Sequence, residues 1–206
     1  MKLYFASGAC SLSPHIALRE AGLPFDLERV DLRAKVTASG EDFRAVNPKG
    51  YVPALKLDDG QILTEGAVIV QWIADQKPES GLIPRAGTFE RYRAQEWLHF
   101  IATELHKGLA PLYNKALPPE IKAATVEKLA NRFSFIAQAL ADRPFLMGSA
   151  FGIADGYAFY TLRSWQRAVR PELPSPVLQA YFERIAARPA VRAALEAEAA
   201  ATPTAA

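Results

Sequence analysis

The chain has one cysteine, Cys10, and this thiol is its strongest candidate for covalent chemistry. A cysteine attacks as the thiolate, and an unperturbed thiol with a pKa near 8.5 is only about 7% ionised near neutral pH. Cys10 lies just before residues 12–21, a predicted helix whose dipole favours the thiolate by roughly 0.3–1 kcal/mol, less than one pKa unit. A mostly ionised thiol needs a shift of about two units. Either a cation or hydrogen-bond donors assist the thiolate, or Cys10 is a small buried apolar residue.

Two histidines are the next candidates. His99 and His106 lie seven residues apart in a predicted helix, so they project from nearly the same face, with Thr103 between them. A metal site is disfavoured, because two histidines are too few ligands and no zinc-type spacing occurs. A structural role is common for such histidines, but His106 and the adjacent Lys107 are also candidates for the assistance that Cys10 needs.

The elements that must position Cys10 follow from the hydropathy pattern. Residues 2–6 are a short apolar run typical of a buried strand, 12–21 form a helix, and 25–32 alternate as a second strand. Together they predict a βαβ unit with parallel strands. Residues 33–42 lack periodicity and are expected to form a polar loop, in which Lys35 is by default a solvated lysine.

A turn at 47–50 then precedes two short strands, 52–57 and 61–63, which predict a hairpin. Pro53 near its start has two explanations. It lies at a sheet edge, or the Val52–Pro53 peptide is cis and turns the Val52 backbone outward to pair with an extended ligand.

Polar residues at the predicted helix starts also have two readings. Ser11 and Ser13 are candidate N-caps of the helix 12–21. Glu65 precedes the helix 67–76, where its carboxylate caps free N–H groups, binds the ammonium group of a ligand, or does both.

The segment 78–87 is rich in proline and glycine and separates the mixed part from a wholly helical remainder. It predicts two domains, 1–80 and 87–206. The helices of the second are expected at 88–113, 120–141, 153–169, 176–187 and 190–199. In the first of these helices the expected buried stripe is Phe89, Tyr92, Trp97, Ile101, Leu105 and Leu109.

Composition limits the function classes. Of the 206 residues 50% are hydrophobic, enough for cores in one large or two small domains. A net charge of +2 from interspersed residues disfavours a nucleic-acid partner. No apolar leader or long apolar span is present, and a single cysteine excludes an intramolecular disulfide, so we expect a cytoplasmic protein without a membrane partner.

Three segments carry a family resemblance. MKLYFASGACSLSPHIALREAGLPF, NPKGYVPALKLDDGQILTEGAVIVQWIAD and EWLHFIATELHKGLAPLY are similar, in order and spacing, to the beta class of bacterial glutathione transferases. The resemblance spans essentially the whole chain. It implies a thioredoxin-like βαβ-α-ββα domain followed by an all-helical domain, a homodimer, and glutathione as co-substrate with no metal or other cofactor.

The resemblance also implies residue roles. In this family pattern Cys10, Ser11 and His106 line the reacting sulfur, with Lys107 nearby. Val52 pairs with the cysteinyl backbone of glutathione, Glu65 and Gly66 hold the γ-glutamyl ammonium and carboxylate, and Lys35 faces the glycine carboxylate. Further positions around glutathione, which reach the partner subunit's ligand, are matched by His99, Thr103 and Glu104. Two residues depart from the family pattern. His99 replaces an asparagine, and Gly152 replaces the Ser or Thr N-cap that forms a capping box with Asp155.

Two reactions are compatible with these residues. Ser11 can stabilise the thiolate of bound glutathione, which then attacks an electrophile. Cys10 can instead exchange with a disulfide, and because Ser13 stands where a C-x-x-C motif has its second cysteine, an external thiol must complete the cycle. We predict a glutathione transferase that conjugates hydrophobic electrophiles and also exchanges disulfides through a protein–glutathione mixed disulfide.

Two alternatives remain open from sequence. One is a non-catalytic member of the fold that binds ligands or proteins, and the other is a glutathione-dependent reductive dehalogenase. An apolar wall for the electrophile is the least specific inference, because aromatic and aliphatic residues on helices are more often core. Its candidates are Leu109, Leu112, Tyr113 and Trp165.

Overall fold

A computed structural model describes residues 1–201, which fall into two compact units. The first comprises Met1–Leu82 and the C-terminal segment from Arg188, and the second comprises Ile83–Ala187. The first unit contains β1 (Lys2–Phe5), α1 (Leu12–Glu20), β2 (Asp26–Asp31), β3 (Val36–Thr37), α2 (Phe43–Val46), β4 (Ala54–Lys56), β5 (Ile62–Thr64), α3 (Gly66–Asp75), a 3₁₀ turn (Pro78–Ser80) and α9 (Pro189–Ala200).

The five strands form one mixed sheet in the order β3-β2-β1-β4-β5. β1 pairs with β2 in parallel, as the βαβ prediction requires, and β4 and β5 form the predicted antiparallel hairpin. The predicted thioredoxin-like arrangement is therefore confirmed in this unit.

The segment 33–42 differs from its prediction as a plain loop. Val36–Thr37 forms the short edge strand β3, antiparallel to β2, and the small helix α2 follows with Asp42 as its N-cap. The Asp42 carboxylate accepts a hydrogen bond from the Arg44 N–H at 2.9 Å. A two-residue strand is too short to show alternation, which is why the hydropathy pattern missed it.

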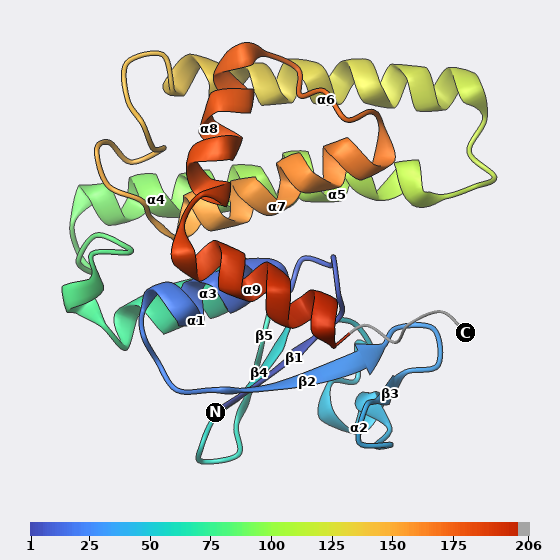
Figure 1. Ribbon diagram of the computed structural model, residues 1–206, viewed down its shortest axis with the longest axis vertical. Helices are drawn as coiled ribbons and strands as arrows, with labels where there is room; N and C mark the ends of the chain where they lie inside the picture. Colours follow the sequence, from blue (N-terminus) through green and yellow to red (C-terminus); the bar gives the residue numbers. More distant parts are fainter. Residues whose placement is uncertain (202–206) are drawn as a thin grey trace. The chain divides into compact units, whose positions relative to one another are not determined.

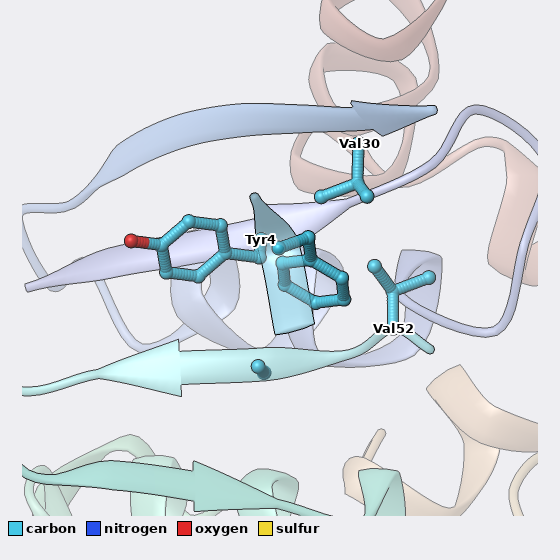
Figure 2. Close-up of a cluster of buried hydrophobic side chains, with 5 residues drawn as sticks. Tyr4, Val30 and Val52 are labelled. Carbon is cyan, nitrogen blue, oxygen red and sulfur yellow. The ribbon is translucent and has the colours of Figure 1, made fainter. Parts of the chain in front are cut away.

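Both faces of the sheet are buried. Successive side chains of β1 alternate between the two faces, and its last three residues are all buried. Leu3 and Phe5 point to one face and Tyr4 to the other. On the Tyr4 face its ring packs against Phe43 of α2, with ring centroids 5.6 Å apart. Val30, Val52 and Ala54 belong to the same cluster, and Figure 2 shows Val30 and Val52 together on the side away from the Tyr4 hydroxyl.

The other face is covered by α1 and α3, which pack against each other (Figure 1). α1 is buried over Leu12–Leu18, because α9 packs on it as well. α9 buries Val191, Ala194 and Glu198, which lie on one face at helical spacing. Arg188, just before α9, donates two hydrogen bonds to the Glu20 carboxylate at 2.6 and 2.8 Å.

The grouping of α9 bears on the domain limits. The chain from Arg188 forms a compact unit with the sheet, whereas the sequence assigned 87–206 to the helical domain. Compact units and family domains are defined differently, so the predicted domain limits 1–80 and 87–206 stay a prediction.

The second unit is helical throughout. It contains α4 (Phe89–Phe100), a π-helical segment (Ile101–His106), α5 (Lys107–Leu109), a 3₁₀ turn (Ala110–Tyr113), α6 (Pro119–Ala139), α7 (Ile153–Ala168) and α8 (Pro176–Ala186). The predicted helix 88–113 is thus a continuous run of helical turns, which changes from α-helical to π-helical, back to α-helical and finally to 3₁₀. A π-helical turn is rare and often accompanies a functional site, and here it carries His106.

The predicted buried stripe of this helix is correct only in its second half. Ile101, Leu105 and Leu109 are buried, but Phe89 and Tyr92 are 67% and 61% exposed. The buried residues of α4 are Arg91, Ala94 and Leu98, which continue to Ile101, Leu105 and Leu109 at spacings of three and four residues. Phe89 and Tyr92 do not lie on this face.

The start of α7 explains the departure at Gly152. Asp155 is fully buried, and its Oδ2 accepts a hydrogen bond from the Gly152 N–H at 2.8 Å, as the capping-box reasoning expects. Its Oδ1 accepts from the Leu146 N–H at 2.9 Å and the Tyr181 hydroxyl at 2.6 Å. Gly152 has no side chain to complete the box. The Asp155 carboxylate therefore joins the start of α7 to Leu146 and to Tyr181 of α8.

Candidate functional site

Cys10 occupies the turn that joins β1 to α1. The Ser13 N–H donates to the Cys10 carbonyl at 3.2 Å, and Leu12 N–H donates to the Ala9 carbonyl, so the turn leads directly into the helix. The side chain is half-buried, and its Sγ lies 3.4 Å from the carbonyl oxygen of Val52, to which the thiol donates. Two residues that the sequence analysis selected for separate reasons are therefore in contact.

Val52 lies two residues before β4. The Val52–Pro53 peptide is cis, which decides between the two alternatives considered for Pro53. Its carbonyl accepts the Cys10 thiol, and within residues 1–201 the Val52 backbone forms no other hydrogen bond. This is the backbone that the resemblance pairs with the cysteinyl residue of glutathione.

Ser11 has a structural position. It is fully buried, and its hydroxyl both donates to the Ala6 carbonyl at 3.3 Å and accepts from the Ala6 N–H at 3.2 Å. Ser11 is the N-cap residue of α1, as expected, but its side chain makes no cap bond to the helix. The hydroxyl instead ties the turn to Ala6, the residue that follows β1.

The same turn is held from α9 by a buried polar network. Arg19 Nε donates to His15 Nε2 at 2.9 Å, so Nδ1 carries the ring proton and donates to Glu198 Oε1 at 3.2 Å. The second oxygen of Glu198 accepts from the Gly8 N–H at 3.2 Å, and the Ser7 hydroxyl donates to the Glu198 carbonyl at 2.8 Å. The turn before Cys10 is therefore held in place by α9.

Glu65 is the residue before α3, and it has a left-handed backbone with φ of 69°. Its carboxylate makes no cap bond, so of the two roles considered for it the capping role is not found. Lys49 Nζ lies 2.6 Å from Glu65 Oε1 and 3.1 Å from Thr64 Oγ1. The hydrogen bond to Glu65 raises the pKa of Lys49. Both side chains are about half exposed and accessible to a ligand.

Lys35 is not the solvated lysine of the default expectation. It also has a left-handed backbone, and its Nζ donates to the Gly50 carbonyl at 2.6 Å. Lys35 and Glu65 thus both contact the loop 47–51, one through Gly50 and the other through Lys49.

In the second unit, His106 is mostly buried between two tyrosines of α7. Its Nδ1 shares a hydrogen bond with the Tyr157 hydroxyl at 2.8 Å, and the rings of Tyr157 and Tyr160 lie 5.8 and 5.1 Å from the imidazole. Burial, and secondly the charge of Lys107, lower the pKa of His106 to about 4. His106 is therefore neutral near pH 7 and offers one ring donor or acceptor, whereas a cation was one of the roles considered for it.

We expect this neutral state to destabilise the protein in acid. The folded pKa of about 4 is below the ordinary 6.5, so the unfolded chain binds the proton first and stability falls as the pH drops from 6.5 to 4. The loss attributable to His106 is roughly 3 kcal/mol at most. His106→Asn should lose less stability than wild type between pH 7 and 4.5 in urea unfolding. Equal losses in the two proteins would contradict this assignment.

The other predicted residues of this unit are spread along one stretch. His99, Thr103 and Lys107 are exposed, and the Thr103 hydroxyl donates to the His99 carbonyl at 2.9 Å. Glu104 Oε2 accepts from Arg132 Nε of α6 at 2.8 Å. Their expected contact with glutathione, and that of His106 and Lys107 with Cys10, stay predictions.

The candidate electrophile wall is divided between core and surface. Trp165 is fully buried against Phe133, and its Nε1 donates to the Glu172 carbonyl at 2.9 Å. Leu109 and Leu112 are buried too, whereas Tyr113 is half exposed and bonds Ser164 Oγ at 2.6 Å. These contacts favour the core reading for Trp165.

A cavity of about 370 Å³ lies elsewhere in the second unit. It contains none of the predicted site residues. Its lining comes from α4 and α6 and consists of Arg93, Glu96, Trp97, Phe100 and Phe135.

Three residues of the site region were missed from sequence: Lys49, His15 and Glu198. Glu198 left a signal, since it is an acid on the otherwise apolar face of an alanine-rich helix. Lys49 left none, because its contact with Glu65 follows from the hairpin register, which pairs Ala54 with Thr64 and brings Glu65 near the 47–51 turn. Among residues 1–201, no cluster of three or more metal-binding side chains occurs, and no helix is long and apolar enough to cross a membrane.

Comparison with known proteins agrees with this arrangement. Residues 8–76 match the model of the glutathione S-transferase N-terminal domain, and residues 100–189 match that of the C-terminal domain. Glutathione S-transferase GstA of Escherichia coli O157:H7 is 46% identical over 199 residues, covering 96% of this chain and 98% of that protein.

Two solved structures are also similar over nearly the full chain. A sphingomonad glutathione S-transferase complexed with glutathione has 46% identity and a TM-score of 0.93, covering 98% of this chain and 100% of the other. The beta-class enzyme of Sphingomonas chungbukensis has 45% identity and a TM-score of 0.91, covering 96% and 98%. The chain therefore belongs to the glutathione S-transferase family, and the prediction of a bacterial beta-class member is confirmed.

Proposed function

We propose that this protein is a glutathione S-transferase that binds glutathione along Val52 with the ligand's sulfur beside Cys10. The observation that carries the proposal is the 3.4 Å contact between the Cys10 thiol and the Val52 carbonyl. It joins the one nucleophilic thiol to the Val52 backbone, which forms no other hydrogen bond in the described chain. An extended peptide that pairs with Val52 would have its cysteinyl residue next to Cys10. The glutathione bound to the sphingomonad relative supports the choice of ligand.

Charged groups suited to both ends of the tripeptide lie in the same unit. Glu65 and the start of α3 at Gly66 suit the γ-glutamyl ammonium and carboxylate, and Lys35 suits the glycine carboxylate. The two side chains differ in sign and contact the same loop, 47–51. A ligand with charges at both ends therefore has a defined direction along Val52.

We propose two reactions at this site. In conjugation, the thiolate of bound glutathione attacks a hydrophobic electrophile and displaces its leaving group or adds to it. In exchange, the Cys10 thiolate attacks a disulfide of glutathione, forms a Cys10–glutathione disulfide and releases the other thiolate. A second glutathione thiolate then attacks this disulfide, releases Cys10 and leaves as oxidised glutathione. Ser13 is buried and bears no thiol, so the external thiol is needed.

The buried hydroxyl of Ser11 is bonded to Ala6, which argues for a structural part in this scheme. For conjugation we retain His106, Lys107, His99, Thr103 and Glu104 as the contribution of the helical unit. His106, being neutral, acts as a hydrogen-bonding group and leaves Lys107 as the cation. We further propose a cytoplasmic homodimer, and sedimentation velocity at micromolar concentration tests the dimer directly.

The proposal predicts one covalent adduct. Wild-type protein exposed to oxidised glutathione should gain the mass of one glutathione, removable by reductant, and Cys10→Ser should gain none. Since Cys10 is the only thiol, the intact mass reports on this residue alone. An unmodified wild type would contradict the exchange reaction, and full conjugation activity in Cys10→Ser would remove Cys10 from that reaction.

A further inference from the structure

Lys49 has a contact that the family resemblance did not assign. Its ammonium lies 2.6 Å from Oε1 of Glu65, the carboxylate proposed to bind the γ-glutamyl ammonium of glutathione. The side chain also donates to Thr64 Oγ1 at 3.1 Å. A carboxylate has about four lone-pair sites, so Lys49 leaves Glu65 able to accept a ligand ammonium as well.

The position of Lys49 is fixed by its own loop. Asn47 is only 2% exposed, and its side-chain amide donates to the Tyr51 carbonyl at 2.7 Å and accepts from the Lys49 N–H at 3.2 Å. The Gly50 N–H donates to the Asn47 carbonyl at 2.8 Å, and Gly50 has a φ of 68° that favours glycine. A buried side chain therefore holds the loop from which Lys49 reaches Glu65.

Lys49 and Glu65 present a positive and a negative group side by side, both about half exposed. The γ-glutamyl end of glutathione presents the same two charges on one carbon, as an ammonium and an α-carboxylate. The two pairs are complementary when they align in opposite directions, with the ligand ammonium on Glu65 and the ligand carboxylate toward Lys49.

We propose that Lys49 is a specificity-determining residue that binds the α-carboxylate of the γ-glutamyl group, beside the start of α3. This rests on the proposed function, because it requires glutathione at Glu65. Lys49 and Glu65 then recognise an α-amino acid head group as a unit. A ligand with the ammonium but without the α-carboxylate would use only half of the pair.

The test compares two ligands on matched variants. Reduced glutathione and an analogue with 4-aminobutanoyl in place of γ-glutamyl, which lacks the α-carboxylate, are titrated calorimetrically into wild type and Lys49→Met. We expect Lys49→Met to weaken glutathione binding roughly fivefold, the effect of a half-exposed ion pair, and to leave the analogue unchanged. Lys56→Met removes another exposed lysine of the same unit and should change neither, while Lys49→Arg should restore part of the glutathione affinity.

Two results would overturn the inference. An equal loss for both ligands would mean that Lys49 only holds Glu65 in place, and tighter glutathione binding by Lys49→Met would mean that Lys49 competes with the ligand ammonium. Failure of the proposed function has a different appearance: wild-type protein would bind neither ligand, and Glu65→Gln would change nothing.

Discussion

Asp155→Ala is expected to destabilise the helical unit by about 3 kcal/mol or more, the largest effect of any single substitution proposed for this chain. The carboxylate is fully buried and accepts hydrogen bonds from the Leu146 N–H, the Gly152 N–H and the Tyr181 hydroxyl. Alanine leaves all three donors without an acceptor, and each unsatisfied buried group costs roughly 1–3 kcal/mol. Burial, and secondly Asp155, raise the pKa of Tyr181, so its hydroxyl stays a donor at neutral pH.

Thermal unfolding measures this effect directly. For a chain of this size 1 kcal/mol corresponds to about 2–4 °C, so the melting midpoint should fall by about 6–12 °C. Tyr181→Phe removes one of the three bonds and should cost about a third as much. Asp142→Ala removes an exposed aspartate and should leave the midpoint unchanged. A drop no larger than that of Asp142→Ala would show that Asp155 is not essential to this junction.

Glu198→Ala should be the second most damaging change, with an expected cost of about 2–4 kcal/mol. It leaves the buried His15 Nδ1–H and the Gly8 N–H without their acceptor, and it removes the carboxylate that links α9 to the turn before Cys10. Breaking a buried charged network by removing one partner costs far more than losing a surface pair. The damage should therefore reach residues that are distant from Glu198 in sequence.

Hydrogen–deuterium exchange distinguishes this local effect from a general loss of stability. We expect faster exchange at residues 6–11 in Glu198→Ala, together with a lower melting midpoint. Glu196→Ala removes an exposed glutamate two residues earlier on the same helix and should alter neither measurement. If exchange at residues 6–11 is the same in both variants, α9 does not hold the turn.

The repeating patterns of the sequence were sufficient to predict most of the fold. Regular elements of ordinary length have a visible period, as in β2, α3 and α7, and all three lie where the pattern predicted them. The failures occur where an element is very short or where its buried face is not made of large apolar residues. β3 spans only two residues, and the buried face of α4 carries Arg91 and Ala94 instead of the predicted Phe89 and Tyr92.

The sequence was sufficient to select candidate site residues, but not to predict which hydrogen bonds they form. Cys10 and Val52 were selected separately, and their contact depends on the sheet order, which a hydropathy pattern does not contain. The capping bonds considered for Ser11 and Glu65 are absent for a related reason. Capping would tie each side chain to its own helix, but the hydroxyl of Ser11 bonds Ala6, just after β1, and the carboxylate of Glu65 bonds a loop lysine. Such pairings arise from tertiary packing.

The position of α9 also has a consequence for how the protein is made. The unit that contains Cys10 is assembled from the first 82 residues and the last stretch of the chain, with the whole helical unit encoded in between. On the ribosome, α1 emerges well before α9, the helix that covers it, so the turn before Cys10 waits for Glu198 until the whole helical unit has been synthesised. A fragment that ends after residue 82 would have the thiol but not the helix that holds its turn.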